Sequence, residues 1–157
     1  MLGYNYPGGP IIEKLALKGE TSYKLPLPKD DKSLDFSFSG LKSEISRLVN
    51  KEKRNIKIND LACSLQHTLA RILSKKIKKA WLVSNAKTII IGGGVIANKF
   101  LRNYLVKEIK KMDKNINIFM PEIEYSTDNG AMIGILAYYK IFDGELPLLR
   151  ENRGILN

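Results

Sequence analysis

The clearest hydrophobic pattern of the chain lies between residues 59 and 81, where apolar side chains recur at the three- and four-residue spacing of one helix face. This spacing predicts one long helix that opens at Asn59 and Asp60. The apolar stripe consists of Leu61, Leu65, Leu69, Ile72, Leu73, Ile77, Ala80 and Trp81. We expect the stripe, with its single tryptophan, to face the core.

Two shorter helices are predicted before this segment. The first begins near Pro10, which suits a first helical turn, and ends near Gly19. The second is capped by Ser39 and carries Leu41, Ile45, Leu48 and Val49 at helical spacing. Between them, Phe36 and Phe38 alternate with a polar residue, which predicts a short strand with both rings facing inward.

The middle of the chain has the order strand, glycine turn, helix, strand. Residues 88–91 are apolar like a buried strand, three glycines follow, a helix carries apolar residues from Ile96 to Ile109, and residues 116–120 form a second strand. This order implies a parallel sheet with a right-handed crossover, so the predicted fold class is α/β. Ligands bind beyond the carboxyl ends of such strands, where the glycines and residues 126–130 lie.

Length and composition fit one soluble domain. The 157 residues contain no apolar run that approaches the roughly 20 residues needed to span a bilayer. The N-terminal MLGYNYPGG lacks the features of a secretory signal, and the single Cys63 cannot form an internal disulfide. We therefore expect a cytoplasmic protein that does not associate with membranes, with Cys63 as a small buried residue.

The net charge of +10 comes from 26 Lys and Arg residues against 16 Asp and Glu residues. Such an excess attracts polyanions, so nucleic acid is one candidate partner. Lysines that solvate the outer faces of helices are an equally good explanation. A coding bias towards Lys, Ile and Asn is a third.

Residues 92–97, GGGVIA, satisfy the loose dinucleotide fingerprint G-x-G-x-x-G/A, in which a phosphate approaches backbone N–H groups. The alternative is a tight strand-to-helix turn without a ligand. The acidic residue that normally follows such a fingerprint would have to be Glu122, which lies too far along the chain. Asn98 offers an amide that can bind a ribose or a base, or it is only an exposed residue of the first helical turn.

Asp128 lies in the polar run STDNG immediately before an apolar helix. Its carboxylate can cap that helix, or it can bind a metal or a nucleotide. The local sequence leaves both interpretations open. The only histidine, His67, has no second His or Cys at metal-ligand spacing, so a structural or surface role is favoured for it.

Four motifs in order resemble the TsaD family, formerly called O-sialoglycoprotein endopeptidases or glycoproteases. They are YPGGP at residues 6–10, DFSFSGLK at 35–42, GGVIANKFLR at 93–102 and STDNGAMI at 126–133. The resemblance covers essentially the whole chain and is greatest to the bacterial and organellar branch. It implies the actin/Hsp70-like ATPase fold, with two lobes around a nucleotide cleft.

The resemblance also implies an activity. Family members are tRNA threonylcarbamoyladenosine synthases of the acyltransferase type, which transfer the threonylcarbamoyl group of threonylcarbamoyl-AMP to N6 of adenosine 37 in tRNAs that read codons beginning with A. Gly9 and Asn98 match positions that contact the adenylate, and Gly93 and Gly94 would pass close to the nucleoside. Asp128 matches the aspartate that binds the metal ion, usually given as iron. The implied partners are tRNA and TsaB-like and TsaE-like proteins.

The departures from the family pattern are equally informative. A full member is roughly twice as long, and its first half carries an H-x-x-x-H helix, a glycine-rich S-G-G phosphate loop and an aspartate upstream of PGGP, none of which is present in this sequence. Residues 1–157 therefore resemble the C-terminal lobe alone, which we expect to be inactive by itself. No Ser-His-Asp arrangement or H-E-x-x-H motif supports the old protease name.

The helix at residues 128–143 is apolar on all sides and requires burial on all sides. We expect it either to recruit the missing N-terminal lobe or to cause self-association. Two other functions stay open: a scaffold half of the modification machinery without catalytic activity, and a dinucleotide-binding oxidoreductase based on the glycine fingerprint.

Overall fold

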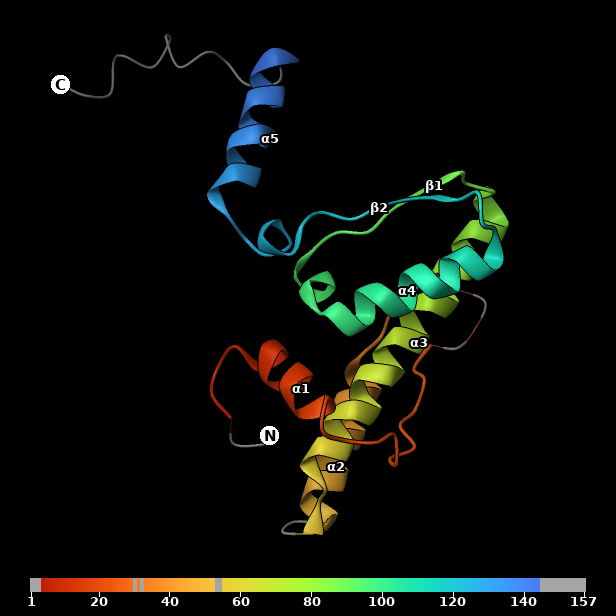
Figure 1. Ribbon diagram of the computed structural model, residues 1–157, viewed down its shortest axis with the longest axis vertical. Coiled ribbons are helices and arrows are strands. Elements are labelled where there is room, and N and C mark those ends of the chain that lie inside the picture. Colours follow the sequence, from red (N-terminus) through yellow and green to blue (C-terminus); the bar gives the residue numbers. More distant parts are fainter. Residues whose placement is uncertain (1–3, 30, 32, 53–54, 145–157) are drawn as a thin grey trace, which may run out of the picture.

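The computed structural model describes residues 4–29, 31, 33–52 and 55–144, and it is rich in helices with one small sheet (Figure 1). The predicted α/β class is confirmed. The elements in chain order are α1 (Gly8–Ala16), α2 (Ser39–Glu52), α3 (Ile58–Ser84), β1 (Thr88–Ile90), the 3₁₀ turn η2 (Gly94–Ala97), α4 (Lys99–Met112), β2 (Asn117–Phe119), the 3₁₀ turn η3 (Ile123–Tyr125) and α5 (Gly130–Phe142).

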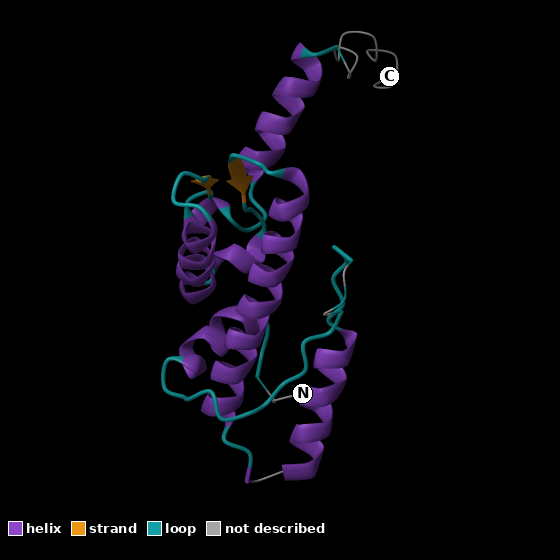
Figure 2. Cartoon of the chain, turned by 90° about the vertical axis from the view of Figure 1, so that its right-hand side faces the viewer, coloured by secondary structure: helices purple, strands orange, loops and turns teal. Residues whose placement is uncertain are grey.

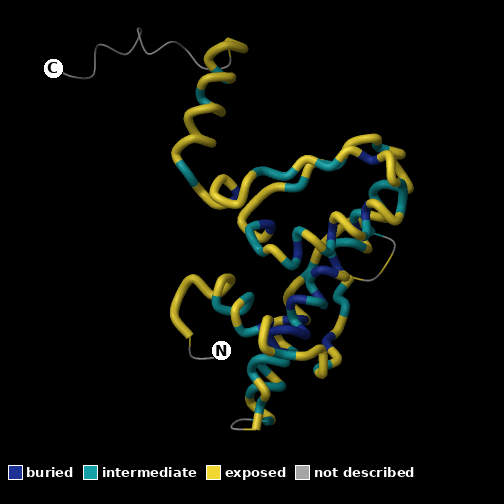
Figure 3. Tube along the Cα trace, in the orientation of Figure 1, coloured by how far each residue is buried: buried dark blue, intermediate teal, exposed yellow. Residues whose placement is uncertain are grey.

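The long helix α3 is the axis of the structure, because α1 and α4 both pack against it (Figure 2). One group of buried side chains joins α2 to α3 and consists of Leu25, Leu41, Ile45, Leu61 and Ile72. A second joins α1 to α3 and consists of Ala16, Ala62 and Cys63. The predicted burial of Cys63 is confirmed, and burial raises the pKa of its thiol. Figure 3 shows the buried residues concentrated along α3 and its neighbours.

The chain after α1 is held closely against the start of α3. A Cβ atom at Gly19 would lie 2.1 Å from the backbone oxygen of Asn59. The carboxylate of Asp60, in the first turn of α3, accepts hydrogen bonds from Glu20 N at 3.0 Å and from Ser22 Oγ at 3.2 Å. Asp60 therefore anchors the preceding segment and makes no side-chain cap for its own helix, which begins at Ile58.

The two strands are parallel, as predicted, with Ile89 opposite Ile118. The prediction that the first strand is buried is wrong, because Ile90 is 78% exposed and Phe119 on the neighbouring strand is 61% exposed. Helices α3 and α4 lie on one face of the sheet (Figure 1), and side chains alternate between the faces of a strand. Ile90 and Phe119 therefore point to the uncovered face.

Two predictions for residues 36–39 are also wrong. The described residues from 33 to 38 form no strand, and Phe36 and Phe38 are exposed, with their rings stacked at a centroid separation of 6.2 Å. The reason is that no described strand lies beside this segment to pair with it. Ser39 is the first residue of α2 rather than the residue before it, and no hydrogen bond of its side chain to the described residues caps the helix.

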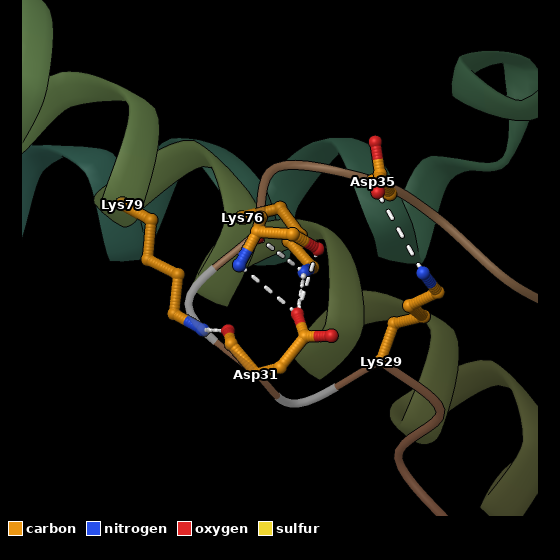
Figure 4. Close-up of polar contacts among 6 residues, drawn as sticks. Lys29, Asp31, Asp35, Lys76 and Lys79 are labelled. Carbon is orange, nitrogen blue, oxygen red and sulfur yellow. Dashed lines mark hydrogen bonds and ion pairs between the residues drawn. The ribbon is translucent and has the colours of Figure 1, made fainter.

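Lysines of α3 bind Asp31 and Ser33 of the segment that precedes α2 (Figure 4). The ammonium group of Lys76, which is 5% exposed, donates to Ser33 O at 2.6 Å and lies 3.5 Å from Asp31 Oδ1. Lys79 donates to the backbone oxygen of Asp31. The hydroxyl of Ser33, together with Lys76, lowers the pKa of Asp31 to about 2. These two lysines therefore bind other residues of the same chain, so not all of the excess positive charge is available to a polyanion.

Helix α5 extends away from the rest of the chain and is exposed along its length (Figures 1 and 3). Large apolar side chains that are at least 40% exposed include Met132, Ile133, Ile135, Leu136, Tyr138, Tyr139, Ile141 and Phe142. The expected exposure of an apolar surface on this helix is confirmed, whereas self-association stays a prediction. No helix of the described part has the length and apolar character needed to cross a membrane.

Candidate functional site

The glycine turn after β1 is open and conformationally specialised. Gly93 has φ of 91° and ψ of 165°, a region that essentially only glycine adopts. Gly93 and Gly94 are exposed, and a Cβ atom at either would meet no atom within 4 Å. A ligand can therefore approach this backbone closely.

The predicted transition from the glycines directly into a helix is wrong. The turn η2 intervenes, Ile96 is buried within it, and α4 begins only at Lys99. Asn98 caps this helix, because its Oδ1 accepts a hydrogen bond from Leu101 N at 2.9 Å. The Lys99 amide is also satisfied, by Glu13 Oε1 of α1 at 2.9 Å. The amides of Lys99 and Leu101 at the start of α4 are thus bonded to side chains, whereas the glycine backbone before η2 stays exposed.

Asn98 is half-buried and fixed by a second partner. Its Nδ2 donates to Oε1 of Gln66 at 2.8 Å, and Gln66 on α3 is only 5% exposed. An amide has two N–H donors and two acceptor lone pairs, so these bonds leave one of each for a ligand. The sequence did not predict the roles of Glu13 and Gln66, because their hydrogen-bond partners lie 86 and 32 residues away along the chain.

Gly9 lies in the first turn of α1, and it is exposed with no atom within 4 Å of the place of a Cβ. The bond from Lys99 to Glu13 joins this helix to the start of α4. In Figure 1 the beginning of α1 and the turn η2 both lie on the left-hand side of α3 and α4. The structure thus places the PGGP and GGVIAN motifs on linked elements.

The polar segment before α5 is linked to the same region through Arg102 of α4. Its Nη2 donates to Pro121 O at 2.6 Å and to Ser126 Oγ at 3.3 Å. Ser126 is 4% exposed, and its hydroxyl donates to Glu122 O at 3.0 Å. The turns η2 and η3 also contact each other. The STDNG motif is therefore connected to the glycine turn.

Asp128 does not cap α5, so that interpretation is wrong. Asn129 is the cap, and its Oδ1 accepts from Met132 N at 3.0 Å. Asp128 is exposed, and its carboxylate has no hydrogen-bond or ion-pair partner among the described residues. The carboxylate is consequently available to a ligand.

The described residues do not form a metal centre by themselves. No group of three or more His, Cys, Asp or Glu side chains gathers anywhere in that part of the chain. Asp128 offers a single hard oxygen ligand, and a bound cation requires several. We therefore derive no reaction step through a metal from this chain alone.

His67 packs in an aromatic cluster, which confirms its structural role. Its ring lies 4.5 Å from that of Phe100 and 6.5 Å from that of Tyr104, between centroids. Burial lowers the pKa of His67 below the usual value of 6.5. The residue serves the contact between α3 and α4.

This lowered pKa predicts a loss of stability in mild acid. At a pH between the folded and the unfolded pKa of His67, the unfolded chain binds more protons than the folded chain. The free energy of unfolding therefore falls as the pH drops below about 6.5, and the contribution of His67 to this fall is complete below the folded pKa. We expect wild-type protein to be less stable to urea at pH 5.5 than at pH 7.5. Because His67 is the only histidine, His67→Phe should remove most of this difference. An unchanged difference in His67→Phe would contradict the assignment.

An apolar groove of about 650 Å³ lies between α2, α3 and the glycine turn. Part of the stripe predicted as core lines it, namely Leu65, Leu69, Leu73 and Ile77, and these side chains are only half-buried. Its other lining residues include Phe36, Phe38, Ile91, Gly92 and Val95. Trp81 is likewise only half-buried, and its Nε1 donates to Ala86 O at 3.1 Å. The described residues therefore cover the apolar stripe of α3 only in part, and the prediction that the whole stripe is core holds incompletely.

Comparisons with known proteins agree on one family. The family model for TsaD, tRNA N6-adenosine threonylcarbamoyltransferase, matches residues 1–135. A curated protein of that name from Mycoplasma capricolum is 45% identical over 145 residues, and one from Caldicellulosiruptor bescii is 42% identical over 155 residues. These alignments cover 90% and 96% of this chain but 45% of each relative. The chain therefore spans about half the length of the curated relatives that it matches.

Proposed function

This chain belongs to the TsaD family of tRNA N6-adenosine threonylcarbamoyltransferases, and on that basis we propose that it supplies one lobe of such an enzyme. Residues 1–157 would correspond to the C-terminal lobe of an actin/Hsp70-like fold. The remaining lobe would come from a segment like the one that the longer relatives have in addition. The reaction would be threonylcarbamoyl transfer from threonylcarbamoyl-AMP to N6 of an adenosine in tRNA.

The observation that carries this proposal is the hydrogen bonding that links three motifs. Glu13 joins the PGGP helix to Lys99 at the start of α4, and Arg102 of α4 donates to Ser126, the first residue of the STDNG motif. Segments more than 80 residues apart in sequence are thereby connected through one helix. Such a linked set of exposed backbone and polar groups fits one wall of a ligand site.

The proposed roles follow from the chemistry of each group. Gly9, Gly93 and Gly94 would lie against the adenylate, because their backbone is exposed without side chains. Asn98 would use its remaining donor and acceptor for the nucleoside. Asp128 would provide one ligand of a metal ion, with the other ligands supplied by the missing lobe.

The proposed transfer needs no protein nucleophile. The N6 amine of the tRNA adenosine attacks the carbonyl carbon of the mixed anhydride, a C–N bond forms, the C–O bond to the phosphate breaks, and AMP leaves. The amine loses a proton to solvent. Orientation of two bound reactants is the contribution that this wall can make. The net positive charge of the chain would favour tRNA as the partner.

The test is a transfer assay with tRNA and threonylcarbamoyl-AMP. The chain would be combined with a separately expressed segment of the Mycoplasma capricolum relative that lies outside the matched region. We expect transfer only from the two together. Complex formation without transfer would favour the alternative of a non-catalytic scaffold half, which could still assemble with TsaB-like and TsaE-like proteins.

The oxidoreductase alternative is disfavoured by the glycine turn. Glu13 places a carboxylate at the amide of Lys99, where a dinucleotide fingerprint would place a pyrophosphate. That amide is therefore not available to a pyrophosphate, and the acidic residue that a dinucleotide site needs is not at the expected spacing. Titration of NADH into the chain alone is expected to show no binding, and saturable binding would restore the oxidoreductase alternative.

A further inference from the structure

Arg102 makes hydrogen bonds in two directions from α4. Its Nε donates to Ile96 O in η2 at 3.3 Å, while Nη2 donates to Pro121 O and Ser126 Oγ. The side chain is half-buried. One guanidinium group thereby bridges the turn after β1 and the segment after β2.

Within the described part of the chain, no other side chain forms hydrogen bonds to both the turn after β1 and the segment after β2. Every hydrogen bond that the structure describes between residues 121–130 and the chain before residue 121 comes from Arg102. The local bonds of Asn129 to Thr127 O and from Met132 N keep the following turn compact. The position of Ser126 therefore determines where Asp128 lies.

We propose that Arg102 is a positioning residue, which fixes the segment bearing Asp128 relative to the glycine turn and Asn98. Its relevance for transfer rests on the proposed function, but the positioning itself does not. All three acceptors are neutral oxygens, and no carboxylate among the described residues pairs with Arg102. The bonds to its acceptors are charge-assisted.

The geometry requires arginine rather than any cation. The planar guanidinium presents N–H groups in fixed, divergent directions, which suits acceptors on two separate segments. A lysine ammonium is a single point and cannot occupy both ends of this bridge. We therefore expect Arg102→Lys to behave like Arg102→Gln rather than like wild type.

Hydrogen exchange of the full chain tests the positioning without any substrate. In Arg102→Gln, the amides of Ser126 and Met132 should exchange at least about tenfold faster, while amides in the middle of α3 stay within about twofold of wild type. Arg47→Gln is the matched control, because Glu44 of its own helix is the one partner of Arg47 among the described residues. Equal acceleration throughout the chain, or none at Ser126 and Met132, would overturn the proposal.

A kinetic measurement separates positioning from substrate binding. In the combined protein, Arg102→Gln should lower kcat about tenfold and leave KM for the adenylate nearly unchanged, because the glycines and Asn98 remain in place. A raised KM at unchanged kcat would mean that Arg102 binds substrate directly and would overturn the proposal. If wild type showed no transfer, the proposed function would fail while the exchange result still decided the role of Arg102.

Discussion

Replacement of Asp128 by alanine is expected to lower threonylcarbamoyl transfer by about 100-fold or more when the chain is combined with the missing segment of a longer relative. The carboxylate is exposed and has no partner among the described residues, so its removal breaks no described contact. Asn129, not Asp128, caps α5. The expected loss therefore reports on the ligand site and not on folding.

The control for this prediction is Asp143→Ala. Asp143 is also exposed and lies at the opposite end of α5, where its backbone N–H bonds Tyr139 O. Both variants should unfold in urea within about 0.5 kcal/mol of wild type. Full transfer activity in Asp128→Ala would remove Asp128 from the site, whereas an equal loss in Asp143→Ala would point to an indirect effect on α5.

Replacement of Gly19 by alanine should have the largest effect on stability, about 2 to 3 kcal/mol in the free energy of unfolding. The added Cβ would lie 2.1 Å from Asn59 O, 2.3 Å from Asn59 C and 2.7 Å from Asp60 N. All three are backbone atoms of α3, so no side chain can rotate away. The segment after α1 would have to move and lose the bond from Glu20 N to Asp60.

Gly40→Ala is the matched control in the first turn of α2. The nearest atom to its added Cβ would be Pro28 Cγ at 3.8 Å, an ordinary van der Waals contact. We expect this variant to be as stable as wild type or slightly more so, since alanine favours the helix. Urea unfolding of both variants is the measurement, and equal stability of the two would contradict the described packing between α1 and α3.

Periodic patterns predicted the regular elements well. The apolar stripe located α3, and the strand, turn, helix and strand order predicted the parallel pair of β1 and β2. These features depend on residues near one another in sequence. The predicted strand at Phe36 and Phe38 failed because alternation alone does not provide a neighbouring strand.

Side-chain partners were much harder to predict. Four residues of the STDNG sequence are of types that cap helices, and only the structure shows that Asn129 is the cap and that the Asp128 carboxylate has no partner among the described residues. Glu13, Gln66 and Arg102 became relevant only through partners on other elements. Their side chains carry no periodic signal, so their contacts depend on the tertiary arrangement.

The incomplete burial in this chain is consistent with its length relative to the family. The groove beside α3, the open face of the sheet and the length of α5 all present apolar side chains. Relatives have more than half of their length outside the matched region. We infer that such a segment covers part of these surfaces, α5 included.

The central claim is that this chain is one lobe of a transferase and is active only together with a second lobe. The most direct test is the initial rate of transfer to tRNA at a fixed concentration of this chain. The missing segment of the Mycoplasma capricolum relative would be titrated against it. We predict no transfer without that segment, and a rate that rises and saturates near equal concentrations of the two. Transfer by this chain alone, or none from a complex that light scattering shows to have formed, would contradict the account.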